Sequence, residues 1–176
     1  RSARTTERVN AFMDDSVIPA EALHYEQLRT ANNRWTRTPV MNELMQRARQ
    51  AGLWMFPLPE RLGGMGLSIV ECAPVAEQYY RSPFGSEIFN CYSGTISNVK
   101  IIDSFGTEEA KARFIPGVLS GEKRSCISIT EREVPSSDPT DLKFSIRRDG
   151  DSYVLNGHKS WATGAITEEC DAIMVL

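Results

Sequence analysis

The sequence has no long hydrophobic run and no marked excess of charge of one sign. Its longest apolar stretches, such as residues 52–57 and 172–176, fall far short of the roughly 20 residues that a membrane-spanning helix needs. The 20 basic and 23 acidic residues are mixed along the chain, so the net charge is -3 and no basic face for nucleic acid is expected. We therefore predict a soluble protein that binds neither membranes nor nucleic acid.

Cysteine and histidine are also scarce. The four cysteines have no Cys-x-x-Cys spacing, which argues against a zinc site and a disulfide framework and indicates reduced, intracellular thiols. The bacterial cytoplasm, the mitochondrial matrix and the peroxisome all fit this prediction. The two histidines, His24 and His158, lie in no pattern that suits a catalytic triad or a metal site, so both are interpreted as solvent-facing or supporting residues. No metal site is predicted.

Up to residue 121 the apolar residues recur at helical spacing, and five helical segments are expected. The first carries an apolar face that includes Val9 and Val17, and Pro19 is expected to interrupt it. Thr38 before Pro39 predicts the start of the second helix, and Gly52 predicts its end.

The later helices have start signals of their own. Ser68 and Glu71 form a capping box at the start of the third helix, the fourth spans residues 94–104, and Thr107 caps the fifth. The glycines at 63–66 could suggest a phosphate-binding loop. No strand precedes them and no Gly-Lys-Ser/Thr follows, so a packing loop is favoured.

Beyond residue 121 the apolar period becomes two, which is typical of strands with one buried face. Hairpin turns are predicted at Asp149-Gly150 and Asn156-Gly157. Strands are expected near residues 125–130, 142–148, 152–155, 158–161 and 171–176. The predicted fold class is α+β: an all-α helical domain, residues 1–121, followed by the start of an antiparallel β-barrel or sandwich domain, residues 122–176.

Polar and aromatic side chains stand at the predicted strand ends. Thr130 ends one strand, while Trp161 and Thr163 end another, and such an arrangement suits a planar cofactor that accepts and donates hydrogen bonds. A second interpretation makes Trp161 part of the core, Thr163 a turn former and Ser136-Ser137-Asp138 a cap or an Asx turn. Spacing alone favours the second interpretation.

Five blocks of sequence, in this order, carry a resemblance to a known family. They are Pro59–Leu67, Phe105–Lys111, Ser120-Gly121-Glu122, Thr130-Glu131 and Gly150–Thr163. Together they resemble the acyl-CoA dehydrogenase family, collinearly over most of the chain after about residue 38. The resemblance implies an N-terminal helical domain, a central β domain and a C-terminal four-helix domain that drives tetramer formation. The first and much of the second are expected here.

In that family FAD lies between the β domain and the C-terminal helices, with the acyl thioester against the flavin. A carboxylate removes the α proton while the β hydrogen leaves as hydride. That carboxylate belongs to the C-terminal domain, so no catalytic residue is assigned here, and these 176 residues alone are expected to show no turnover. Glu131 is expected to be structural.

The resemblance also implies roles for individual residues in binding FAD. Thr130, with the backbone of Ile127 and Ile129, would bond the pyrimidine side of the flavin. Ser137 would reach the FAD pyrophosphate or the thioester end of the acyl-CoA substrate. Trp161 would pack on the isoalloxazine ring, and Thr163 would bond near the reactive flavin nitrogen.

The loop Thr130–Asp138 departs from the family pattern. It is one residue longer than usual, lacks the glycine and contains Pro135, which restricts the backbone. Ala162 replaces an isoleucine and leaves more room beside the ring. The expected partners are an acyl-CoA, an electron-transfer flavoprotein as acceptor and further copies of the chain in a dimer or tetramer. Alternatives are a flavin monooxygenase or acyl-CoA oxidase of the same fold, or a non-catalytic scaffold subunit with an impaired FAD site.

Overall fold

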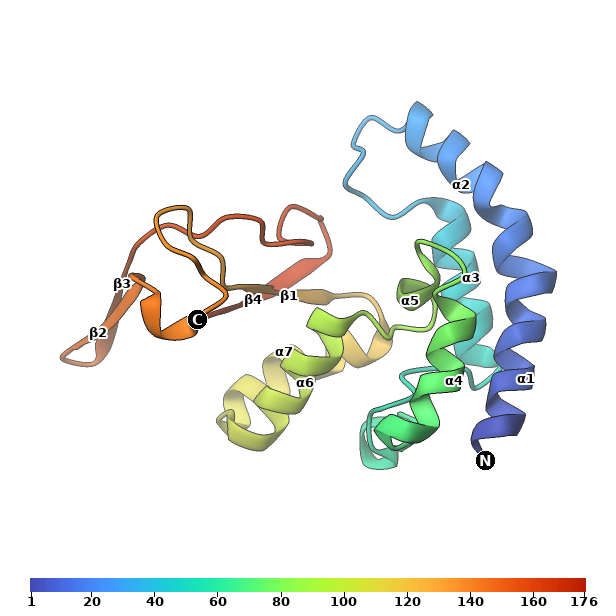
Figure 1. The fold of residues 1–176 in the computed structure, drawn as a ribbon, viewed down its shortest axis with the longest axis horizontal. Helices are drawn as coiled ribbons and strands as arrows, with labels where there is room; N and C mark the ends of the chain where they lie inside the picture. The colour runs from blue at the N-terminus through green and yellow to red at the C-terminus, as the bar shows by residue number, and fades with distance from the viewer.

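The computed structural model describes all of residues 1–176, which form a larger helical lobe and a smaller β lobe (Figure 1). The helical lobe contains α1 (Ser2–Phe12), which packs along α4 (Ile69–Tyr79), and α3 (Pro39–Gln50), which contacts the short α5 (Gly85–Ile88). A pair of helices, α6 (Ser93–Phe105) and α7 (Glu108–Ser120), lies between this bundle and the strands. None of these helices combines the length and apolarity that crossing a membrane requires.

The first helix does not stop at Pro19, contrary to the prediction. α1 passes into a π-helical turn, Met13–Val17, and then into α2, Ile18–Thr30. In the π turn the amide of Ile18 donates to the carbonyl of Met13. This places Pro19 in the first turn of α2, where its missing amide costs no helical hydrogen bond.

The predicted start of α3 is confirmed. The hydroxyl of Thr38 accepts from the amide of Met41 at 3.4 Å, and it also lies 2.9 Å from Nδ1 of His24. His24 is buried against the ring of Phe84, and this burial lowers the pKa of the imidazole. His24 therefore has a supporting position under the α3 N-terminus, whereas His158 is exposed.

The other predicted helices are also present. Ser68 and Glu71 form the reciprocal capping box of α4, and the hydroxyl of Thr107 accepts from an amide of α7 at 3.2 Å. The structure adds α5 and a 3-10 turn, Glu60–Leu62. The following glycine loop is tightly packed, because a Cβ at Gly64 would lie 2.2 Å from the carbonyl oxygen of Leu58.

The core of the helical lobe has two parts. The larger part lies among α1 to α5, and the smaller part joins the α3 side to the α6–α7 pair. The smaller part consists of Met45, Trp54, Met55, Leu58, Ile96, Val99 and Val118. Trp54 Nε1 also donates to the carbonyl of Leu119 at 3.0 Å, so apolar packing and a hydrogen bond together fix α7 on the bundle.

The β lobe contains two separate two-stranded sheets, which do not close into a barrel. β2 (Ser145–Asp149) and β3 (Ser152–Asn156) form the predicted antiparallel hairpin around Gly150, whose φ is 61°. β1 (Arg124–Ser128) instead pairs in parallel with β4 (Cys170–Val175), which the prediction of an antiparallel domain did not include.

The predicted strand at 158–161 is absent, and Asn156-Gly157 does not start a second hairpin. The reason is that this segment turns back toward the end of β1. The amide of Ser160 donates to the carbonyl of Thr130 at 2.8 Å, and Lys159 Nζ donates to the carbonyl of Ile129 at 2.8 Å. These contacts hold the segment in an irregular path.

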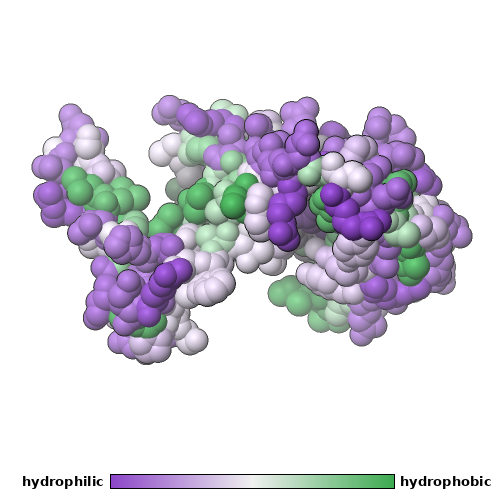
Figure 2. All heavy atoms as spheres, turned by 90° about the horizontal axis from the view of Figure 1, so that it is seen from above, coloured by the Kyte–Doolittle hydropathy of each residue, from purple (hydrophilic) through white to green (hydrophobic).

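Every residue of β2 and β3 is exposed, so the predicted buried face is missing from this hairpin. Its apolar side chains, including Ile146 and Leu155, have no second layer to pack against within these 176 residues. Figure 2 accordingly shows apolar side chains on the surface of the smaller lobe. Such an isolated hairpin is expected to be the least stable element of the fold.

The cap at Thr38 gives a test of the helical lobe. We expect Thr38→Ala to lower the free energy of unfolding by about 2 kcal/mol, because it removes both the cap of α3 and the partner of buried His24. Thr107→Ala, which removes an exposed cap, is expected to cost only about 0.5–1 kcal/mol. Urea denaturation measures both, and equal losses would contradict the supporting role of His24.

Candidate functional site

β1 carries the chain from the helices to the predicted cofactor site. Its position is set by polar contacts, since Asn98 Nδ2 on α6 donates to the carbonyl of Cys126 at 2.9 Å. At the start of the strand, Arg124 forms an ion pair with Glu87 of α5. The last residues of β1 therefore lie at a defined place relative to the helical lobe.

Thr130 follows the end of β1 with its polar groups available. Ile127, Ile129 and Thr130 are half-buried, and the Thr130 carbonyl accepts from Ser160. The amide and the hydroxyl of Thr130 take part in no hydrogen bond within the chain. Both can therefore bond a ligand, as the resemblance implies.

Glu131, the next residue, is buried and fully bonded. Its carboxylate accepts from the amides of Lys143 and Phe144 at 2.7 and 2.8 Å and from Lys159 Nζ at 2.8 Å. These donors, Lys159 first, lower the pKa of Glu131 to about 2. A carboxylate held in this way is a poor proton acceptor at neutral pH, and the predicted structural role is confirmed.

The loop that contains Ser137 is shaped by its two neighbours. The Ser136 hydroxyl accepts from the amide of Glu131 at 2.7 Å, and the Asp138 carboxylate accepts from the amide of Thr140 at 2.9 Å, capping a 3-10 turn at Pro139–Asp141. The predicted cap is thus present. Ser137 itself is exposed, and its hydroxyl has no partner within the chain.

Trp161 and Thr163 lie on the segment that faces away from the core. The Trp161 side chain is 81% exposed and its φ is 61°, so the interpretation of Trp161 as a core residue is wrong. Thr163 is a turn former, as the alternative predicted, because its amide donates to the Trp161 carbonyl at 2.9 Å. Its hydroxyl and the Trp161 indole nitrogen have no partner within the chain.

The predicted site residues form three groups: residues 127–130, Ser137, and Trp161 with Thr163. The structure brings the first and the third of these groups together directly. Residues 127–130 and the segment leading into 161–163 are joined by Lys159 and Ser160, and the loop of Ser137 is tied to this pair through the bond between Ser136 and Glu131.

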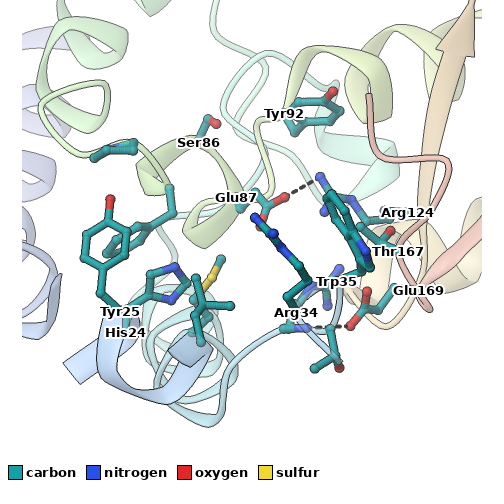
Figure 3. Close-up of a pocket in the computed structure, with 16 residues that line it drawn as sticks. His24, Tyr25, Arg34, Trp35, Ser86, Glu87, Tyr92, Arg124, Thr167 and Glu169 are labelled. Carbon is teal, nitrogen blue, oxygen red and sulfur yellow. Dashed lines mark hydrogen bonds and ion pairs between the residues drawn. The ribbon is translucent and has the colours of Figure 1, made fainter. Parts of the chain in front are cut away.

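A cavity of about 340 Å³ lies where the helical lobe meets the segment after Thr163 (Figure 3). Arg124 and Glu87 form an ion pair in its wall, and Arg124 also lies over the ring of Tyr92. On the other side, the amide of Arg37 donates to Glu169 at 3.2 Å. Sequence reasoning missed these residues, because partners so far apart leave no local pattern.

These contacts hold the segment that bears Trp161 and Thr163 on the helical lobe. Tyr92 donates its hydroxyl to the carbonyl of Thr163 at 3.3 Å, and Asn33 Nδ2 donates to Glu168 at 2.7 Å. One ion pair, Arg124 with Glu87, and the hydrogen bonds of Arg37, Tyr92 and Asn33 join the two lobes, so the arrangement works as an interlobe clamp. The chain has no cluster of three or more His, Cys, Asp or Glu side chains placed to hold a metal ion.

The chain is similar to known proteins in sequence and in fold. The family described as "Acyl-CoA dehydrogenase, N-terminal domain" matches residues 3–122. Acyl-CoA dehydrogenase family member 11 of Gallus gallus is 37% identical over 172 residues, which are 96% of this chain and 22% of the relative. The chain therefore spans about a fifth of that relative's length.

Two solved structures are also similar. A protein from Mycobacterium abscessus assigned to the acyl-CoA dehydrogenases has a TM-score of 0.90 and 36% identity, covering 99% of this chain and 45% of that one. An acyl-CoA dehydrogenase from Bacillus anthracis, solved in complex with FAD, has a TM-score of 0.68 and 26% identity, covering 99% of this chain and 28% of that one.

The lowered pKa of Glu131 predicts a loss of stability in acid. Because the pKa is about 2 in the folded chain and 4.5 in its ordinary state, the stabilisation is complete above pH 4.5 and is lost as the pH falls toward 2. We expect the free energy of unfolding of Glu131→Gln to fall less between pH 5 and pH 2.5 than that of the wild type. Urea midpoints at the two pH values measure this. Glu133→Gln, an exposed change in the same loop, should retain the wild-type dependence.

Proposed function

This chain belongs to the acyl-CoA dehydrogenase family, and on that premise we propose that it is part of an enzyme that oxidises acyl-CoA thioesters between the α and β carbons. The chain forms the helical domain and one side of the FAD site of this enzyme. The observation that supports the proposal most is the set of unpartnered polar groups at the strand ends. They are the Thr130 amide and hydroxyl, the Ser137 hydroxyl, the Trp161 indole nitrogen and the Thr163 hydroxyl.

These groups fit the hydrogen-bonding edge and the ring of a flavin. Thr130, with the backbone of Ile127 and Ile129, holds the pyrimidine side, while Trp161 covers the ring and Thr163 bonds near its reactive nitrogen. Ser137 reaches the pyrophosphate or the thioester. The exposure of Trp161 supports its assignment, because a large indole without a packing partner costs free energy unless a ligand or another surface covers it.

FAD, when bound, accepts the hydride that leaves the β carbon of the acyl chain. The residues of this chain bind and orient the ring, and none of them removes the α proton. The carboxylates next to predicted site residues are both engaged: Glu131 by Lys159 and two amides, and Asp138 by the amide and hydroxyl of Thr140. We therefore assign the base to a part of the enzyme that these residues do not include.

The proposal extends to partners. An acyl-CoA is the substrate, an electron-transfer flavoprotein the acceptor, and further copies of the chain complete a dimer or tetramer that works in fatty acid metabolism. The compartment is the bacterial cytoplasm, the mitochondrial matrix or the peroxisome. The exposed apolar side chains of the β lobe support an assembly in which further protein covers them.

FAD binding tests the proposal. We expect the purified chain to bind FAD and to show the visible flavin spectrum, and Trp161→Ala to weaken the affinity about tenfold, because ring stacking contributes on the order of 1.5 kcal/mol. Trp35→Ala is the matched control, since Trp35 is also exposed but lies outside the predicted site. Titration of FAD against tryptophan fluorescence measures the affinities.

The outcomes separate the alternatives. A colourless chain that takes up no FAD would contradict the proposal for these residues and favour a scaffold subunit. Anaerobic bleaching of the flavin by acyl-CoA in the assembled enzyme is the result expected for a dehydrogenase. Oxygen consumption coupled to turnover would instead indicate an oxidase or a monooxygenase.

A further inference from the structure

Lys159 holds a buried position that the proposed function does not explain. Its side chain is 7% exposed, and its ammonium group donates both to Glu131 and to the carbonyl of Ile129, each at 2.8 Å. The ammonium also lies 5.1 Å from the centre of the Phe144 ring. A lysine is rarely buried unless its charge is balanced, and here Glu131, itself 3% exposed on its side chain, balances it.

The two acceptors of Lys159 stand on either side of Thr130. The carbonyl of Ile129 belongs to the same peptide group as the amide of Thr130, so a cation bound to that carbonyl polarises the group. The Thr130 amide becomes a stronger donor as a result. This amide donates to no atom of the chain, so its strengthened bond is available to a ligand.

Lys159 also fixes the segment that carries Trp161. Only Ser160 separates the two residues, and the amide of Ser160 donates to the carbonyl of Thr130 at 2.8 Å. Trp161 then takes a φ of 61°, a value that a bulky side chain adopts only when its surroundings impose it. We infer that the contacts of Lys159 and Ser160, which fix the two residues before it, contribute to this conformation.

We propose that Lys159, balanced by Glu131, is a positioning residue of the flavin site. Lys159 makes the Thr130 amide a stronger hydrogen-bond donor to an electron-rich carbonyl of the ligand, and it sets the distance between Thr130 and Trp161. This inference rests on the proposed function, because it takes the ligand to be FAD. Lys159 acts through Thr130 and Trp161 and needs no contact with the flavin of its own.

The variants Lys159→Met and Lys159→Arg test the proposal by FAD titration of the purified chain. We expect Lys159→Met to weaken FAD binding at least tenfold and to shift the visible flavin bands, and Lys159→Arg to restore part of the affinity. Lys111→Met is the matched control, since Lys111 pairs with Glu108 at the same 2.8 Å on α7, away from the site. It should bind FAD like the wild type.

A second measurement needs no FAD. In the wild-type chain the Thr130 amide proton should resonate downfield, and in Lys159→Met it should move upfield because the Ile129 carbonyl has lost its cation. If Lys159→Met fails to fold because Glu131 is left unpaired, the double variant Glu131→Gln, Lys159→Met removes both charges and tests the same loss.

The results distinguish the two proposals. If the wild type binds FAD and the folded Lys159 variants bind it equally well with an unchanged spectrum, the positioning role is overturned and the proposed function stands. If the wild type takes up no FAD, the proposed function is overturned and this inference with it. Weaker binding in Lys159→Met with an unmoved Thr130 resonance would overturn the polarisation of the amide.

Discussion

The buried ion pair between Glu131 and Lys159 sets the path of the chain through the predicted flavin site. A buried charge without a partner is costly, so the pair can form only if the segments around residues 131, 143–144 and 159 converge. Their convergence places Thr130 beside Ser160 and turns the chain toward Trp161. The irregular path of residues 157–163 thus follows from electrostatics and hydrogen bonding.

The helical lobe supplies none of the predicted flavin contacts, yet it fixes where they lie. Asn98 and Glu87 seat β1, while Tyr92 and the segment around Arg37 hold the residues that follow Trp161. Each of these contacts crosses between the lobes. Those of Asn98, Glu87 and Arg37 are partly or wholly withdrawn from water, which strengthens them, whereas the bond of Tyr92 is exposed. The ion pair of Arg124 with Glu87 lines the cavity between the lobes and helps to hold β1 on the helical lobe.

Much of the fold could be predicted from the sequence where the cause is local. The caps at Thr38, Ser68 and Thr107 and the turn at Gly150 each depend on residues within three or four positions, and all are present. The interruption at Pro19 was wrong, because a π turn shifted the proline to a tolerated position. The strand at 158–161 was wrong, because distant bonds outweighed the alternating pattern.

The amino-acid sequence alone reveals the order of the helices, the change to β structure near residue 121, the family resemblance and the candidate flavin residues. These conclusions rest on local spacing and on collinear motifs, both of which a linear chain displays. The folded chain is needed to see that Trp161 is exposed, that β1 pairs in parallel with β4, and that Lys159 pairs with Glu131. Burial and charge pairing depend on residues far apart in the chain, and only folding brings those residues together.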